Sequence, residues 1–205
     1  MRLNRETIIQ VALELLDEVG LDDLTTRRLA DRLGIQSPTL YWHFTSKQAL
    51  LTAMAYAMLK DLDAQPVPAD VEWRTLLRDN AHSFRRALLS HRDGARIHAG
   101  TIPSVDQLPK MEAVIRLLNT AGFSLKEAAT MLLAVSRFVV GWVLEEQAAA
   151  NNPDERAKSY PALEQFPLAS EAFALLRNQS ADAAFDDGLS LLLRSLRPGE
   201  QATHI

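Results

Sequence analysis

The stretch TTRRLADRLGIQSPTLYWHF, residues 25–44, is the part of this chain that decides its interpretation. Apolar residues keep the spacing of one helical face up to Leu33, and Gly34 ends that helix, as glycine commonly does. Ser37 is a good cap for a second short helix, and Pro38 suits its first position, where the missing N–H costs nothing. Two short helices joined by a tight turn that contains Gly make a helix-turn-helix.

The second of these helices leaves three ring-bearing side chains outside its packed face. Leu40 and Phe44 take the inward positions, so Tyr41, Trp42 and His43 are expected at the surface. Aromatic rings are usually buried, and DNA binding would explain their exposure. In that case the helix N-terminus would reach base edges, while ring O–H and N–H groups would reach phosphates. An ordinary helical corner with aromatic packing is the alternative, and the pattern alone leaves it open.

The remainder of the chain has a helical pattern almost throughout. Leu and Ala, both strong helix formers, dominate it, and no alternating run of β-branched residues predicts a strand. Thr45–Gln48 and Ser124–Glu127 have the form of capping boxes. We expect helices over residues 5–19, 26–33, 38–44, 45–63, 71–89, 107–121, 125–147, 168–178 and 181–197, with an irregular piece at 91–104 and an exposed loop at 148–167. The predicted fold class is therefore all-α, with a three-helix helix-turn-helix domain over residues 1–47 and a larger helical core over 48–205.

The charge balance places a condition on any binding to nucleic acid. The 205 residues carry 22 basic and 26 acidic side chains, a net charge of -4. Residues 1–47 alone hold six basic and seven acidic residues, so a positive surface has to arise from local geometry. Cys is absent, which excludes disulfides, thiolate zinc sites and a Cys nucleophile. The sequence contains no GxSxG, HExxH, P-loop or GxGxxG motif, and we therefore do not expect an enzyme.

Residues 128–144 are apolar enough to resemble a membrane span. Arg137 lies near their middle, where it would cost about 2.5–3.5 kcal/mol in a bilayer. The segment is also shorter than the roughly 20 residues a span needs. We expect it to lie inside a helical bundle or an oligomer, with no membrane partner. The N-terminus shows no apolar leader segment, which predicts a cytoplasmic protein.

The segment LTTRRLADRLGIQSPTLYWHFTSKQALL resembles the DNA-binding domain of the tetracycline repressor (TetR) family. The resemblance continues through LRDNAHSFRRALLSHRDGARIHAGTIP, which is similar to the first part of the drug-binding core of the tetracycline repressors in that family. GFSLKEAATMLLAVSRFVVGWVLEEQ is similar to their dimerisation helix. The resemblance implies a homodimeric transcriptional repressor that binds palindromic double-stranded operator DNA. It also implies that a small-molecule inducer bound in the larger core moves the fourth helix and releases the DNA.

The resemblance also implies which residues contact DNA. They are Thr26, Arg27, Ser37, Pro38, Thr39, Tyr41, Trp42, His43 and Lys47. Arg27 would read a guanine through a bidentate contact. Ser37 stands where the tetracycline repressors have an adenine-reading Gln. Because Ser cannot make that bidentate pair, the operator can differ at that base pair.

The family's drug contacts fall on a second set of positions. They are Asp63, Asn80, Phe84, His98, Thr101, Ile102, Pro103, Val114 and Glu145. By resemblance, His98 would bind Mg²⁺ that is already chelated by a tetracycline-like drug, while Thr101 and the partner subunit's Glu145 would reach the ion through water. One imidazole completed by oxygen donors suits such a hard cation. Without the resemblance, His98 reads as an ordinary, hydrogen-bonded and partly buried histidine.

Three of these positions depart from the tetracycline pattern. Asp63, Ile102 and Val114 stand where the family's tetracycline repressors have His, Arg and Gln. Ile102 and Val114 remove hydrogen-bond donors and make the pocket more apolar, and Asp63 reverses the electrostatic character of its site. The alternative to a magnesium-chelated tetracycline is therefore a different, metal-independent drug or metabolite, either more apolar or cationic near Asp63.

Overall fold

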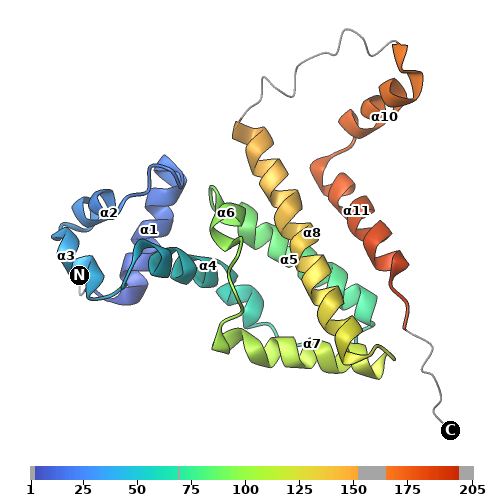
Figure 1. The fold of residues 1–205 in the computed structure, drawn as a ribbon, viewed down its shortest axis with the longest axis horizontal. Helices are drawn as coiled ribbons and strands as arrows, with labels where there is room; N and C mark the ends of the chain where they lie inside the picture. The colour runs from blue at the N-terminus through green and yellow to red at the C-terminus, as the bar shows by residue number, and fades with distance from the viewer. Residues whose placement is uncertain (1–2, 69, 152–164, 199–205) are drawn as a thin grey trace.

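The computed structural model describes residues 3–68, 70–151 and 165–198, and regular structure within these ranges is entirely helical (Figure 1). The elements are α1 (Arg5–Val19), α2 (Thr26–Leu33), α3 (Ser37–Tyr41), α4 (Lys47–Asp63), α5 (Trp73–Leu89), α6 (Gly94–His98), the 3₁₀ turn η1 (Val105–Gln107), α7 (Leu108–Thr120), α8 (Leu125–Asn151), α10 (Pro167–Arg177) and α11 (Ala181–Ser195). The predicted all-α class is confirmed.

Helices α2 and α3 form the predicted helix-turn-helix. The Thr25 side chain caps α2 by accepting a hydrogen bond from the Arg28 N–H at 3.2 Å, and Gly34 ends the helix at a φ of 67°. Both ends of α3 differ from the expected range 38–44: the N-cap is Gln36, so Ser37 already lies in the first turn, and the helix ends at Tyr41. The Gln36 carbonyl accepts from the Thr39 N–H at 2.9 Å, which starts the helix one residue earlier.

The two expected capping boxes have different outcomes. Ser46, rather than Thr45, caps α4 by accepting from the backbone N–H of Ala49 at 3.0 Å. Ala at that third position has no side chain that can return a bond, so the expected box is wrong. The box at the start of α8 is confirmed, because Ser124 and Glu127 exchange hydrogen bonds of 2.8 and 3.3 Å.

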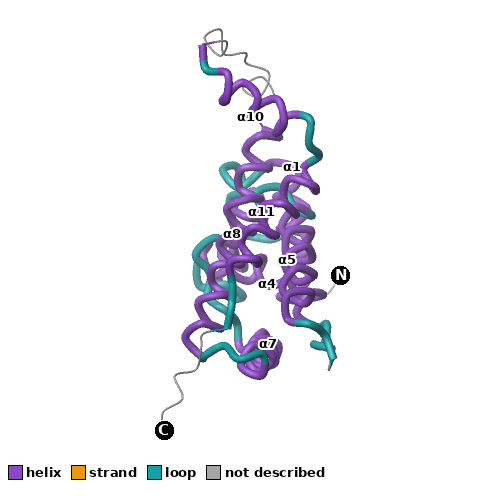
Figure 2. Tube along the Cα trace, turned by 90° about the vertical axis from the view of Figure 1, so that its right-hand side faces the viewer, coloured by secondary structure: helices purple, strands orange, loops and turns teal. Residues whose placement is uncertain are grey.

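Two hydrophobic cores organise the molecule. The first, which we call the head core, joins α1, α2, α3 and most of α4, and it includes Ile97 from α6. The second core joins α5, α7, α8 and α11 around Phe185, Val139 and Leu118. Figures 1 and 2 show α5, α8 and α11 running side by side, with α7 crossing the end of α8. Helix α4 connects the head to this bundle.

Among the described residues, helix α8 is the one helix that is long and apolar enough to cross a bilayer by length and composition alone. Its inner row, Met131, Val135 and Val139, is buried in the second core, while Arg137 is exposed. This is the packing of a core helix in a bundle.

Three boundaries between residues 91 and 167 differ from expectation. The piece expected to be irregular, 91–104, contains α6, which begins after Asp93 at a φ of 57°. Helix α8 continues to Asn151, so the first four residues of the expected loop 148–167 are helical. Residues 152–164 of that loop lie outside the described residues, and α10 begins at Pro167, where Pro is favoured in the first turn.

Candidate functional site

The predicted DNA-contact residues gather on the outer surface of α2, α3 and the start of α4. None of them is buried. Trp42 is 89% exposed and Tyr41 is 53% exposed, although Phe44, two and three residues further along the chain, is buried. This confirms that the aromatic side chains face outward. Arg5 holds the turn that carries them, because its guanidinium donates to the His43 carbonyl at 2.8 Å and lies over the Phe44 ring at 4.3 Å.

The arginines of α2 are not equivalent. Arg28 pairs with Asp23 at 3.3 Å, and Arg32 makes two hydrogen bonds, of 2.9 and 2.5 Å, to Glu18. Arg27 is exposed and has no hydrogen bond or ion pair within the described part of the chain. Its charge is therefore free to act on a ligand.

Two acidic residues near the exit of α1, Asp17 and Asp22, bind residues of the larger core. Asp17 accepts hydrogen bonds from His91 at 2.9 Å and from the Arg92 backbone at 2.8 Å, while Asp22 pairs with Arg96 at 2.7 Å. The hydrogen bond to Arg96 lowers the pKa of Asp22 and keeps it ionised. Residues 1–47 keep a net negative charge, but the carboxylates of Asp17 and Asp22 bind residues outside the head, while Asp23 and Glu18 pair with Arg28 and Arg32 of α2.

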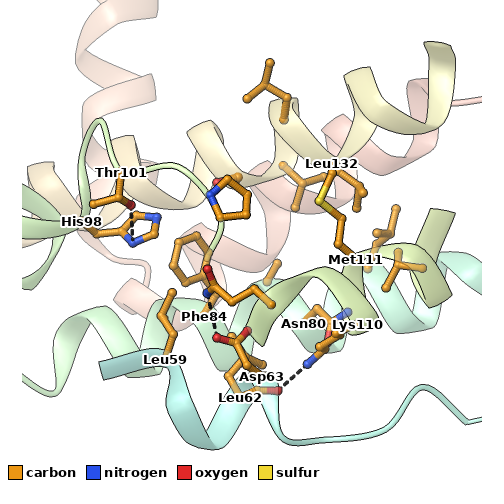
Figure 3. A pocket seen from close by; sticks show the side chains of 18 of the residues that line it. Leu59, Leu62, Asp63, Asn80, Phe84, His98, Thr101, Lys110, Met111 and Leu132 are labelled. Atoms are coloured by element: carbon orange, nitrogen blue, oxygen red, sulfur yellow. Dashed lines mark hydrogen bonds between the residues drawn. The ribbon is translucent and has the colours of Figure 1, made fainter. Parts of the chain in front are cut away.

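A cavity of about 510 Å³ lies where α4, α5, α7, α8 and the segment after α6 meet (Figure 3). Eight of the predicted drug-contact residues line it: Asp63, Asn80, Phe84, His98, Thr101, Ile102, Pro103 and Val114. Glu145, the ninth, lies on an exposed face of α8 and is not part of this lining. Within this chain, therefore, His98 and Thr101 lie together at the cavity and Glu145 lies apart from them.

His98 occupies one end of the cavity as the last residue of α6. Its ring packs edge-on against Phe84 at 5.0 Å between centroids, and its Nδ1 lies 3.4 Å from the Thr101 hydroxyl. Burial lowers the pKa of His98, so the imidazole is neutral at pH 7 and keeps a lone pair for a metal or a hydrogen-bond donor. Among the described residues no three His, Asp or Glu side chains gather around a common point. This donor set is too small for a resident metal ion, but it suits an ion that arrives with other ligands attached.

The opposite end of the cavity carries charges that were only partly predicted (Figure 3). The Asp63 carboxylate accepts a hydrogen bond from the Gln107 amide at 2.7 Å. The Lys110 ammonium donates to the Leu62 carbonyl at 2.5 Å. Burial raises the pKa of Asp63 and lowers that of Lys110, and each charge partly offsets the effect of burial on the other.

Gln107 and Lys110 were not found from the sequence. The available signal was periodic, because residues 107, 110, 111 and 114 follow the spacing of one helical face, and Val114 was already predicted to line the pocket. This periodicity identifies Gln107 and Lys110 as cavity residues only when it is already known that the inner face of α7 packs against the cavity.

Helix α6 touches both the cavity and the head. Next to His98, Ile97 is 4% exposed and belongs to the head core. At the other end of α6, the Asp93 carboxylate accepts from the Leu21 N–H at 2.9 Å, and Arg96 reaches both Asp93 and Asp22. A displacement of His98 is therefore mechanically connected to the exit of α1.

Comparison with known proteins gives consistent matches along most of the chain. Residues 8–54 match the family model described as bacterial regulatory proteins of the tetR family, and residues 65–198 match the model of the tetracyclin repressor-like C-terminal domain. The class A tetracycline repressor from transposon 1721 of Escherichia coli is 48% identical over 95% of this chain and 91% of its own length.

Two solved structures are similar over comparable lengths. A TetR variant from Acinetobacter baumannii AYE, in complex with minocycline, has a TM-score of 0.78 and 44% identity over 95% of this chain and 96% of that chain. TetR of class A in complex with 5a,6-anhydrotetracycline and magnesium has a TM-score of 0.73 and 43% identity over 96% of this chain and 100% of that chain.

Proposed function

This chain belongs to the tetracycline repressor family of bacterial transcriptional regulators, and from that premise we propose that it represses transcription until a small-molecule inducer releases it from operator DNA. The observation that carries the proposal is the double role of α4. Its first part is packed into the head core, and its last residues, Leu59, Leu62 and Asp63, line the cavity. A ligand in the cavity thus acts on the helix that carries the DNA-binding surface. A gel shift with an operator selected from random duplexes, titrated with tetracycline, tests the proposal.

We assign operator recognition to the surface of Thr26, Arg27, Ser37, Pro38, Thr39, Tyr41, Trp42, His43 and Lys47. The support is that none of these residues is buried and that the charge of Arg27 has no partner within the described part of the chain. In a dimer, two such surfaces would enter successive major grooves about 34–36 Å apart, so the operator is a palindrome with that half-site spacing. The role is non-enzymatic, as it is in the repressors that the chain resembles, and a DNA-binding regulator of this kind acts in the cytoplasm.

We propose that the homodimer forms through α8 and α11. Leu133 on α8 is 50% exposed and Leu191 on α11 is 66% exposed, although both helices also contribute to the second core. Pairing these outer faces by a twofold axis would produce a four-helix bundle and bury them. A dimer would also allow Glu145, on the exposed side of α8, to act at the partner's cavity.

The structure identifies the appropriate substitution for testing this dimer. Leu192 packs against the second core of its own protomer, whereas Leu191 faces outward. Leu191→Glu should therefore yield a folded monomer in sedimentation at micromolar concentration, while Leu193→Glu, at a buried position, should prevent folding. A dimer that persists in Leu191→Glu would place the interface elsewhere.

We further propose that the inducer is a tetracycline-like drug bound together with Mg²⁺. The class A relative solved with 5a,6-anhydrotetracycline and magnesium supports this proposal, as do the neutral imidazole of His98 and the adjacent Thr101 hydroxyl. The ion would neutralise the drug's chelating oxygens and link them to His98, with Thr101 and the partner's Glu145 acting through water. The competing candidate is a metal-independent ligand, favoured by the apolar Ile102 and Val114. Release of operator DNA that is undiminished in EDTA, or in His98→Ala, would favour that candidate.

The division of the chain at residue 47 stays a prediction. Helix α4 begins at Lys47, so the proposed boundary separates the DNA-binding surface from the helix that carries it.

A further inference from the structure

The polar end of the cavity holds two opposite charges that do not pair with each other. Asp63 ends α4 and Lys110 lies in the first turns of α7, and both side chains are half-buried. Within the described residues, Asp63 has Gln107 as its hydrogen-bond donor, and Lys110 donates to a backbone carbonyl. No ion pair within 4.0 Å joins the two.

Both groups keep unused bonding capacity. A carboxylate can accept about four hydrogen bonds and an ammonium can donate three. Asp63 uses one oxygen toward Gln107, and Lys110 uses one N–H toward Leu62. Most of the surrounding lining is apolar, including Leu77, Phe84 and Val114 in addition to Leu62. Charges held in such surroundings gain more from a matching ligand group than they would in water.

On the basis of this arrangement, and resting on the proposed function of the cavity as an inducer site, we propose that Asp63 and Lys110 together select a zwitterionic ligand. The ligand's ammonium group would bind Asp63, and an anionic oxygen a few ångströms away on the same ligand would bind Lys110. A ligand that carried only the ammonium would be attracted by Asp63 and repelled by Lys110, and one that carried only the anion would meet the reverse. A zwitterion satisfies both groups and brings no net charge into an apolar cavity.

The two ends of the cavity then recognise different parts of one ligand. His98 and Thr101 lie at one end and Asp63 and Lys110 at the other, as the labelled side chains show (Figure 3). Tetracycline has the matching chemistry, because it carries a dimethylammonium group beside an acidic enol on one ring and its metal-chelating oxygens on the far side of the molecule. Its dedimethylamino analogue keeps the chelating oxygens and the enol but lacks the ammonium group, which makes the two drugs a matched pair of probes.

The test is a titration of the full-length protein with each drug at saturating Mg²⁺, followed by calorimetry. For the unsubstituted protein, the dissociation constant of the analogue should exceed that of tetracycline by about tenfold or more, the usual effect of losing a hydrogen bond to a charged group. In Asp63→Asn this ratio should fall to within about twofold of unity, since a neutral amide discriminates weakly between the two drugs. Lys110→Met should weaken both drugs. Asp61→Asn, an exposed acidic position on the same helix, is the matched control and should keep the original ratio.

Each ratio compares two drugs on the same protein sample, so a loss of folded protein cancels. A ratio near one in the unsubstituted protein, or a ratio that survives Asp63→Asn, overturns the zwitterion assignment. If both drugs nevertheless release operator DNA, the proposed repressor function stands even though the zwitterion assignment is wrong. Conversely, a strong ammonium preference without any release of DNA supports the assignment and refutes inducer-driven release. Binding of neither drug overturns the assignment.

Discussion

Replacing Arg27 by alanine isolates the contribution of direct base recognition. A bidentate arginine contact to a guanine is worth about 1–3 kcal/mol of discrimination. The proposed dimer presents the side chain twice, so the two half-sites together should lose roughly 2–6 kcal/mol, or about thirtyfold to about 20,000-fold in operator affinity. Arg27 makes no internal bond in the described part of the chain, so its removal should leave the stability of the head nearly unchanged.

Arg28→Ala is the matched control, because it removes the same charge one residue further along α2. Arg28 is already paired with Asp23 at the surface, and an exposed pair of this kind contributes about 0–1 kcal/mol. Non-specific attraction to the phosphates should fall similarly in both variants. The difference between them therefore reports the base contact.

Fluorescence anisotropy with the selected operator and with a scrambled duplex, at several salt concentrations, measures both quantities. Arg27→Ala should weaken operator binding far more than scrambled binding and should relax the preference at one base pair in each half-site. If the two duplexes weakened alike, Arg27 would contact a phosphate and the assignment to a base would be refuted. A larger loss of specificity in Arg28→Ala would refute it as well.

Three further substitutions test other parts of the structure. Lys47→Ala should weaken operator and scrambled DNA about equally and lower the salt slope by about 0.9 per lost phosphate contact, and a sequence-dependent loss would contradict this role. Arg85→Met leaves the largely buried Glu146 without its 2.7 Å partner, which should cost about 3 kcal/mol of stability and lower the melting temperature by about 6–12 °C. Arg86→Met, the control, should change the melting temperature little, and equal melting temperatures for the two variants would count against this reasoning. Because burial raises the pKa of Asp63, the ionised carboxylate destabilises the fold above that pKa, and Asp63→Asn should melt at a higher temperature than the unsubstituted protein at pH 7. This difference in melting temperature should vanish as pH falls through the folded pKa to the ordinary Asp range. A difference that does not depend on pH would contradict the prediction.

The helices whose bounds were predicted to within a residue are those whose ends are determined by nearby residues in the sequence. The bounds of α1 and α2 agree with expectation because each helix ends at a glycine with positive φ, Gly20 or Gly34. Helix α6 could not be found in this way. It has five residues, and its backbone is held from a distance by Gln147, which accepts from the Ala95 N–H at 3.3 Å and donates to the His91 carbonyl at 2.9 Å.

The cavity shows the same division between local and distant causes. Eight of the residues that the resemblance pointed to line the cavity, but the resemblance did not supply Gln107 and Lys110, whose positions depend on η1 and α7 packing against the end of α4. The charge of the head also depends on contacts between residues far apart in the sequence. Counting acids in residues 1–47 predicts no basic surface, because the sequence does not show that Asp17 and Asp22 bind side chains 70 or more residues away.

Helix α6 is too short to absorb a movement at one of its ends. A ligand that shifts His98 also shifts Ile97, which is packed in the head core, and Arg96, which holds Asp22. Side-chain contacts of α6 therefore connect the cavity to the head core and to the exit of α1, and close-packed contacts of this kind tend to switch between discrete arrangements. Linkage then requires reciprocity: if the inducer lowers operator affinity by some factor, the bound operator must lower inducer affinity by the same factor. In the proposed mechanism, the sensitivity of release is thus set as much by the bonds between α6 and the exit of α1 as by the contacts that the drug itself makes.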